Sequence, residues 1–423
     1  MARTHSATRR TFLTQVAAFA AVGALDPFQA VVGAEPSADR SSKVSAAQGR
    51  VIDVKSETQE YKDPDTGVRV LRLASGDFDN VHPYFTTTSF VGDGHEQIVF
   101  ASKRSGVFQF YLLELRSGRL VQLTDGKGVD PNNACVDPAG RLFYFSDTVL
   151  RAVKTDGTDD RELYRSPEGF WGSLPTCTAD GRYVAFAYRE RLKQSTNTGK
   201  IYATMPESLF QRPRCVVMRV DTSSGEAVAA WGDAAWMSHV LIHPTQPNLI
   251  LFCHEGGSNV KQRMWIVDAD ERPRQPRPLY VQRSGENCTH EYFTRQGDVG
   301  FQCYTSVERR EGYNAFIRPD GTWIRQFLLP GTAPRHIQSN SDNSMLVGDC
   351  GYRNRREKDG SSWMSLMTHP NGRVEVRRLC RHGTSWKTQY GHPHAVFSPD
   401  DRWVLFNSDD QGRNNVYMAE VPG

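Results

Sequence analysis

The chain has 423 residues and a mass of 47.6 kDa, with 38% hydrophobic residues, 10% aromatic residues and a mean hydropathy of −0.54. This composition predicts a soluble globular protein with a sizeable core, and it argues against chain-wide disorder and a membrane-spanning architecture. The formal net charge is +3, and Arg3, Arg9 and Arg10 all lie near the N-terminus. Without that segment the charge is close to neutral, so no nucleic-acid partner is expected.

Residues 1–34 have the pattern of a twin-arginine export signal, because Arg9 and Arg10 precede an apolar stretch rich in alanine and valine. The stretch is interrupted by glycine, aspartate and proline, and it is short for a transmembrane helix, although an N-terminal anchor is an alternative. We therefore expect a folded protein that is exported to the periplasm or secreted, with no membrane span in its mature form. Residues 35–50 are polar and predict a flexible linker, which leaves 51–423 as the folded domain.

A turn followed by a short apolar strand recurs along the domain. The clearest copies are 137–145, 179–186 and 399–406. Seven turns begin near positions 91, 136, 178, 243, 294, 340 and 398. These spacings are typical of propeller blades with loop insertions, and a second strand and hairpin follow each turn strand. The repeats predict an all-β fold, a seven-bladed β-propeller with four strands in each blade.

The two ends of the domain predict how the ring closes. The last unit supplies only three strands, at 392–398, 402–408 and 414–421. Residues 51–73 form a spare hairpin with its turn at 63–67, placed before the first full unit. We expect this N-terminal segment to pair into the last blade, since that arrangement removes exposed strand edges.

Histidines recur at one position of the strands that should line the central channel. His239, His290, His336 and His394 each stand four residues before a turn. His392 lies two residues before His394, so both side chains face the same side of the strand. A His-x-His pair with a third histidine from another blade is one way to hold a first-row divalent metal. The alternative is that these histidines only hydrogen-bond one another and trapped water.

Other local patterns exclude several classes of enzyme. No Gly-x-Ser-x-Gly elbow, Walker motif or dinucleotide-binding glycine motif is present, and His254-Glu255 does not extend to a zincin motif. Eight cysteines include no Cys-x-x-Cys pair, which predicts buried thiols and not a zinc cluster. The charged run 189–193 either contacts an anionic ligand or solvates a loop.

Six strings of sequence together resemble the oligogalacturonate lyase family, over roughly residues 55–421. They are Asp-Pro-Asp-Thr-Gly-Val at 63–68, Phe-Cys-His-Glu-Gly at 252–256, Arg-Met-Trp at 263–265, Cys-Thr-His-Glu at 288–291, Thr-Ser-Trp at 384–386 and Gln-Tyr-Gly-His-Pro-His at 389–394. The resemblance implies a seven-bladed propeller that cleaves oligogalacturonate in pectin breakdown. Such cleavage is a β-elimination that leaves a 4,5-unsaturated uronate, so the expected partner is an acidic oligosaccharide.

The same resemblance implies roles for individual residues. It implies Mn²⁺ bound by His290, Gln389, His392 and His394, and His239 as the general base. Imidazole and amide ligands would also accept Ni²⁺, Co²⁺ or Zn²⁺, so manganese is an implication of the resemblance alone.

Three further residues are candidates for contact with the substrate. The resemblance implies an arginine close to the Met-Arg-Val-Asp run, where this chain has Arg214. His336, next to Arg335, is a substrate contact or a second candidate for the base. Two other hypotheses stay open: a non-catalytic periplasmic propeller that docks protein partners, and a uronate lyase or epimerase acting on a different glycan.

Overall fold

The computed structural model describes residues 48–305, 312–329, 334–350 and 362–423, all of which belong to the unit Ala38–Gly423. The predicted export signal at 1–34 and most of the predicted linker lie outside the described residues. Among the described residues, no helix has the length and apolar character needed to cross a membrane.

The turns that define the repeats are built from side-chain and backbone hydrogen bonds. In the second unit the Asp137 carboxylate accepts the Arg141 N–H at 2.8 Å, and the Gly140 N–H donates to the Asp137 carbonyl at 3.1 Å. Gly140 has φ +87°, a conformation that glycine adopts at little cost. The chain therefore reverses at this point and the next strand pairs back on the previous one.

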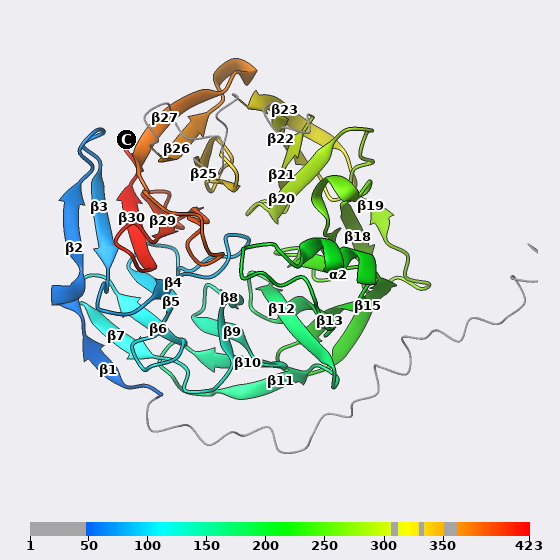
Figure 1. Ribbon diagram of the computed structural model, residues 1–423, viewed down its shortest axis with the longest axis horizontal. Coiled ribbons are helices and arrows are strands. Elements are labelled where there is room, and N and C mark those ends of the chain that lie inside the picture. Colours follow the sequence, from blue (N-terminus) through cyan, green and yellow to red (C-terminus); the bar gives the residue numbers. More distant parts are fainter. Residues whose placement is uncertain (1–47, 306–311, 330–333, 351–361) are drawn as a thin grey trace, which may run out of the picture. The chain divides into compact units, whose positions relative to one another are not determined.

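The described strands form seven antiparallel sheets arranged as blades around a central axis, which confirms the predicted all-β, seven-bladed propeller (Figure 1). From the axis outward, the first three blades are β4 (Asn80–Val81), β5 (Gln97–Ser102), β6 (Gln109–Glu114), β7 (Arg119–Gln122) and β1 (Val51–Asp53); β8 (Val129–Val136), β9 (Arg141–Ser146), β10 (Val149–Lys154) and β11 (Arg161–Arg165); and β12 (Phe170–Cys177), β13 (Tyr183–Glu190), β14 (Arg214–Asp221) and β15 (Ala227–Ala234).

The remaining four blades follow in chain order. They are β16 (Met237–Ile242), β17 (Leu249–His254), β18 (Met264–Asp268) and β19 (Arg277–Pro278); β20 (Asn287–Phe293), β21 (Val299–Tyr304), β22 (Gly312–Ile317) and β23 (Trp323–Leu329); β24 (Ile337–Ser339), β25 (Met345–Asp349), β26 (Trp363–Thr368) and β27 (Glu375–Arg381); and β28 (Val396–Phe397), β29 (Trp403–Ser408), β30 (Asn415–Glu420), β3 (Arg69–Leu73) and β2 (Gln59–Lys62). The described helical segments are η2 (Lys55–Glu57), α2 (Met205–Gln211), η3 (Gly257–Asn259) and η4 (Pro370–Gly372).

The N-terminal segment closes the ring, as the sequence predicts, but it serves two blades. Strand β3 pairs antiparallel with β30, and β2 lies outside β3 in the last blade. The prediction that all of 51–73 belongs to this hairpin is wrong, because β1 pairs with β7 in the first blade. Directly after β1, the buried Val54 donates its N–H to the Gly118 carbonyl at 2.9 Å, just before β7. That contact holds β1 on the otherwise unpaired edge of β7.

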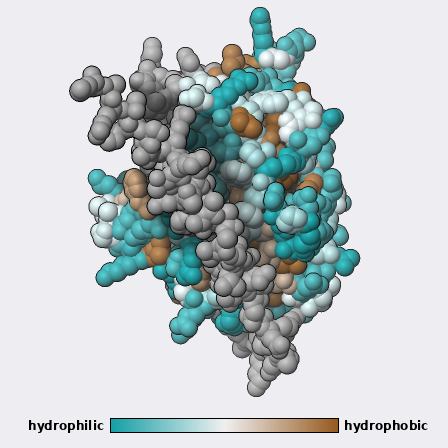
Figure 2. All heavy atoms as spheres, turned by 90° about the vertical axis from the view of Figure 1, so that its right-hand side faces the viewer, coloured by the Kyte–Doolittle hydropathy of each residue, from teal (hydrophilic) through white to brown (hydrophobic). Residues whose placement is uncertain are grey.

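The hydrophobic core lies between neighbouring blades. One cluster joins the last and first blades and includes Leu73 of β3, Phe100 of β5 and Leu405 of β29, none of which is exposed. In the described part of the chain no disulfide is present, and six of the eight cysteines are buried. The part of this side of the ring that is coloured in Figure 2 is mostly hydrophilic, with small, separate hydrophobic areas.

Candidate metal and catalytic site

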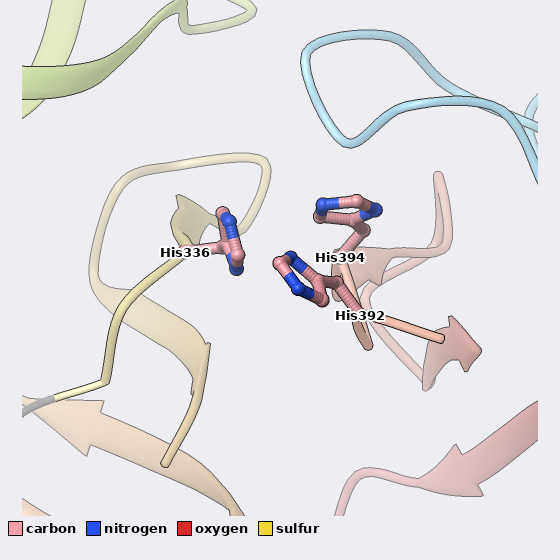
Figure 3. A group of neighbouring side chains, drawn as sticks. All are labelled: His336, His392 and His394. Atoms are coloured by element: carbon pink, nitrogen blue, oxygen red, sulfur yellow. The ribbon is translucent and has the colours of Figure 1, made fainter. Parts of the chain in front are cut away.

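Three buried histidines from two neighbouring blades meet near the axis. His336 immediately precedes β24, while His392 and His394 precede β28. One ring nitrogen from each lies within 4.8 Å of the other two, and the three rings point toward one another (Figure 3). Three imidazole nitrogens at this separation have the number and type of donors that a first-row divalent ion requires.

The structure brings together part of the predicted ligand set. Gln389 Nε2 lies 3.5 Å from His394 Nε2, and Gln389 Oε1 accepts a hydrogen bond from the Tyr202 hydroxyl at 2.9 Å. His336, predicted as a substrate contact or second base, supplies the third imidazole of this group beside His392 and His394, and the prediction of His290 as a ligand stays a prediction. The ring centroid of His290 is 4.5 Å from that of His336, so His290 lies at the border of the cluster.

Bulges in two inner strands help to place His239 and His290. The register of β16 against β17 shifts between Ser238 and Leu241, and that of β20 against β21 shifts between Thr289 and Tyr292. Within these shifts His239 has φ +44° and His290 has φ +58°, a left-handed conformation that is uncommon for residues other than glycine. Bulges re-aim side chains next to functional sites, and such backbone strain is concentrated there.

The imidazoles of His336 and His290 are each oriented by a polar side chain that binds Nδ1. His336 Nδ1 donates to Asp349 Oδ2 at 2.6 Å, and the His336 backbone N–H donates to Asp349 Oδ1 at 2.8 Å. His290 Nδ1 donates in the same way to Gln302 Oε1 at 2.9 Å. In both residues this leaves Nε2 with its lone pair, and a carboxylate behind an imidazole is the usual support of a metal ligand. Burial raises the pKa of Asp349 to about 6.

The imidazoles of the cluster are in the neutral form that binds metal. Burial is the main cause, and it brings the pKa of His336 and His394 well below the usual range and that of His392 to about 4. The positive charge of Arg335 lowers the pKa of His336 and His392 further. His394 Nδ1 is buried and has no hydrogen-bond partner among the described residues. A neutral, buried nitrogen without a partner fits a metal ligand.

His239 lies in a second group of buried charged residues. Its Nδ1 is 3.1 Å from Glu291 Oε1 and its Nε2 is 3.9 Å from Glu255 Oε1. Arg263 joins the two carboxylates: Nε and Nη2 donate to Glu291 at 2.9 and 3.1 Å, and Nη1 donates to Glu255 at 3.2 Å. The Tyr84 hydroxyl lies 3.3 Å from His239 Nε2.

Arg263 keeps both carboxylates ionised. Burial alone would raise their pKa values, but the nearby Arg263 and His239 outweigh it, so that the pKa of Glu291 lies well below its usual range and that of Glu255 falls to about 2. Two carboxylates held in this way can orient His239 and stabilise its imidazolium once it has accepted a proton. The ring of Tyr84 is 4.6 Å from that of His394, so Tyr84 links the two groups.

Several members of this site were not predicted from the sequence. Glu255, Arg263 and Glu291 all lie in the strings that carry the family resemblance, so a search for ionisable residues in those strings would have found them. Tyr84 follows the two-residue strand β4, and Asp349 ends the otherwise apolar β25. No signal in the sequence singles out Tyr84.

The two arginines proposed as substrate contacts differ in their surroundings. Arg214, at the start of β14, is half-exposed and its Nη2 lies 2.9 Å from Glu190 Oε1. Arg335 is half-buried beside His336, and its backbone N–H donates to the Asp349 carbonyl at 2.9 Å. Arg335 is therefore adjacent to the histidine cluster, and Arg214 forms an ion pair with Glu190.

Comparison with known proteins agrees with this geometry. The chain is 28% identical over 383 residues to an oligogalacturonide lyase of Pectobacterium atrosepticum, and 27% identical over 378 residues to an oligogalacturonate lyase of Dickeya dadantii; each alignment covers 86% of this chain and 95% of the relative.

Two solved structures, each 28% identical with a TM-score of 0.79, cover 89% of the chain. They are an oligogalacturonate lyase in complex with manganese, of which 98% is covered, and an oligogalacturonate lyase from Vibrio parahaemolyticus, of which 99% is covered. These relatives are enzymes, so the hypothesis of a non-catalytic scaffold is set aside. The model of the oligogalacturonate lyase family matches residues 46–423, and the chain therefore belongs to this family of polysaccharide lyases.

Proposed function

We propose that the protein cleaves 4-linked oligogalacturonate by metal-dependent β-elimination and releases a 4,5-unsaturated uronate. The observation that carries this proposal is the juxtaposition of two buried groups: a neutral three-histidine cluster, and His239 backed by ionised carboxylates, with Tyr84 in contact with both. The membership in the family and the manganese complex of a relative support the same reaction.

His336, His392, His394 and Gln389 would hold the metal. Their nitrogen and amide donors are uncharged at neutral pH, so the ligands leave the full charge of a divalent ion unneutralised. When bound, such an ion supplies a Lewis acid to the substrate carboxylate, on which negative charge accumulates as the C5 proton leaves. Manganese is the metal of the related structure, and the donor set itself would also accept other first-row ions.

His239 is the proposed general base. Its Nδ1 faces Glu291, which leaves Nε2 to accept the C5 proton. The electrons of the C5–H bond form the C4–C5 double bond, the C4–O bond breaks, and the departing oxygen takes up a proton. Positioned proton transfer of this kind contributes about 10²–10⁴-fold to the rate. Glu291 and Glu255 then stabilise the protonated imidazole.

The remaining residues have supporting roles in the proposal. Arg335 places a positive charge beside the histidine cluster, where it would attract the substrate carboxylate. His290, with Nδ1 held by Gln302, presents Nε2 at the border of the cluster as a substrate contact. The twin-arginine pattern at 1–34 supports export of the folded protein to the periplasm or beyond.

The direct test is an assay of the ultraviolet absorbance of the unsaturated product across a panel of uronate oligomers. We expect activity on oligogalacturonate, loss of that activity after chelation and dialysis, and recovery with added Mn²⁺. Absorbance that rises only with a different uronate oligomer would replace the proposed substrate. Full activity after chelation, with metal analysis showing none bound, would contradict the metal-dependent mechanism.

A further inference from the structure

One end of the third blade carries a cluster of arginine and tryptophan side chains that the proposed reaction does not use. The guanidinium carbon of Arg189, near the end of β13, lies 4.3 Å from the ring centroid of Trp236 and 5.4 Å from that of Trp171. The guanidinium carbon of Arg191 lies 5.7 Å from the Trp171 centroid. We call these four residues the Arg189 cluster.

Arg189 is half-buried, and it differs from the buried Arg263 in having no carboxylate partner among the described residues. Its Nη1 is buried, with neither a hydrogen-bond nor an ion-pair partner among the described residues. Arg263 pairs with Glu291 and Glu255, and Glu190, the residue next to Arg189, pairs with Arg214. Burial lowers the pKa of Arg189 and outweighs the opposite effect of the nearby Cys215 and Glu255, as expected for a cation held away from water without a direct ion pair. Placing a positive charge in this way costs stability, so folding alone does not account for it.

The Arg189 cluster lies close to the proposed general base. Trp236 immediately precedes β16, and His239 is the third residue of that strand, so their α-carbons are roughly 10 Å apart along the strand. The Trp236 carbonyl accepts the Glu255 N–H at 2.8 Å, and the Glu255 carboxylate lies beside His239. This separation exceeds the width of one sugar ring but is within reach of a short oligomer.

The chemistry of the cluster fits a uronate. A guanidinium offers paired N–H donors that match a carboxylate, and each unit of a galacturonate chain carries one carboxylate. Trp171 is 45% exposed, which leaves part of its indole available to the apolar face of a sugar ring. Arg191 is exposed and adds a second positive charge.

We propose that Arg189, with Arg191 and Trp171, forms a binding subsite for a uronate unit of the substrate that lies beyond the bond being cleaved. This inference rests on the proposed function, since it assigns the same substrate a longer footprint. It means that the enzyme binds longer oligogalacturonates more tightly than the dimer, which is too short to occupy both the reacting position and this subsite.

The test measures equilibrium binding by calorimetry in a His239→Ala background, where turnover is removed. Digalacturonate and tetragalacturonate are titrated into that protein and into the same protein with Arg189→Gln. We expect Arg189→Gln to weaken tetragalacturonate binding about tenfold and to change digalacturonate binding by less than twofold. An equal loss for both oligomers, or no loss for either, would overturn the proposal.

Two further variants test the subsite without changing Arg189, so the test does not depend on whether Arg189→Gln folds. Arg191→Gln and Trp171→Ala alter exposed side chains and are expected to weaken only tetragalacturonate binding, by about threefold or more. The control is Arg182→Gln, which removes a positive charge next to the other end of β13, where Arg182 pairs with Asp221. It should leave both titrations unchanged. The proposed function is contradicted by a different result, namely that the wild-type protein gives no unsaturated product. The subsite proposal is also contradicted if neither oligomer binds the His239→Ala protein.

Discussion

Removal of Arg263 should destabilise the fold strongly, because it leaves two buried carboxylates without their cation. Glu291 is not exposed at all, and the Glu255 side chain is 14% exposed. Arg263, with His239 and a hydrogen bond from the Ser238 hydroxyl, brings the pKa of Glu255 from 4.5 to about 2 against the effect of burial, which is equivalent to about 3 kcal/mol of stabilisation of the charged form. Breaking a buried ion pair by loss of one partner costs about 3–5 kcal/mol. We expect Arg263→Met to lose an amount in this range at pH 7.

The loss should depend on pH in a defined direction. In the wild type the folded-state pKa of Glu255 is depressed, so its stabilising effect is present above the unfolded-state pKa near 4.5 and is lost as the pH falls toward about 2. In Arg263→Met burial dominates and raises the folded-state pKa, so that stability is lost as the pH rises above the unfolded-state value. The difference between the two proteins should therefore be larger at pH 7 than at pH 4.5.

Urea denaturation of both proteins at the two pH values measures this difference. Arg69→Met is the matched control, because Arg69 pairs with Glu60 on the surface, where water screens an ion pair and it contributes little to stability. A free energy of unfolding for Arg263→Met within about 1 kcal/mol of the wild type at pH 7 would refute the argument. A loss that is the same at both pH values would show that packing, and not charge, is responsible.

Three other predictions concern the base, the metal and the closure of the ring. His239→Ala should lower kcat by about 10²-fold or more with bound metal unchanged, which assay and metal analysis on one preparation can check. Asp349→Asn should weaken Mn²⁺ binding about 10- to 100-fold in a calorimetric titration, because Asp349 orients His336; unchanged affinity would exclude that role. Leu73→Ala should cost about 2–5 kcal/mol in denaturation, whereas Val51→Ala, half-exposed on β1, should change stability little; equal effects would contradict closure through β3.

The repeat pattern was sufficient to predict the architecture, because each blade is a local unit whose turns and strands follow from nearby residues. The hairpin at 59–73 could be assigned to the last blade since that unit lacked an outer strand. The pairing of β1 with β7 could not be predicted in the same way. The three residues Val51–Asp53 carry no pattern that distinguishes one open edge from another, and the choice depends on the contact of Val54 with Gly118 across the folded blades.

The common register of the inner strands identified the histidines but not their grouping. That grouping follows from the order of the blades around the ring. His239 and His290 belong to the fourth and fifth blades, His336 precedes the first strand of the sixth, and His392 and His394 precede that of the seventh. Neighbouring blades are neighbours in space, so the blade that carries His336 lies between the blade of His290 and that of the His392–His394 pair. Tyr84 reaches the axis from the loop after β4, so the register of the inner strands could not identify it.

This order makes the choice between His336 and His290 as a metal ligand an experimental question with a clear expected answer. His336 shares the 4.8 Å group with His392 and His394, whereas His290 is outside that group, with its ring centroid 4.5 Å from that of His336. His336→Ala should therefore weaken Mn²⁺ binding by more than about 100-fold. Loss of a residue that only supports a ligand weakens it by about 10- to 100-fold. His290→Ala should retain about one equivalent of metal per chain and lose activity through weaker substrate binding.

Metal analysis after dialysis and a Mn²⁺ titration distinguish the two variants. His243→Ala is the control, because His243 is a buried histidine that contacts Phe293 and the backbone of the following turn, away from the cluster. It should keep its metal. If His290→Ala loses metal while His336→Ala keeps it, the ligand set is His290, Gln389, His392 and His394, and His336 becomes a substrate contact. Loss in both variants would mean that all four imidazoles are needed to hold the ion, with His290 binding through Nε2 while its Nδ1 keeps the hydrogen bond with Gln302.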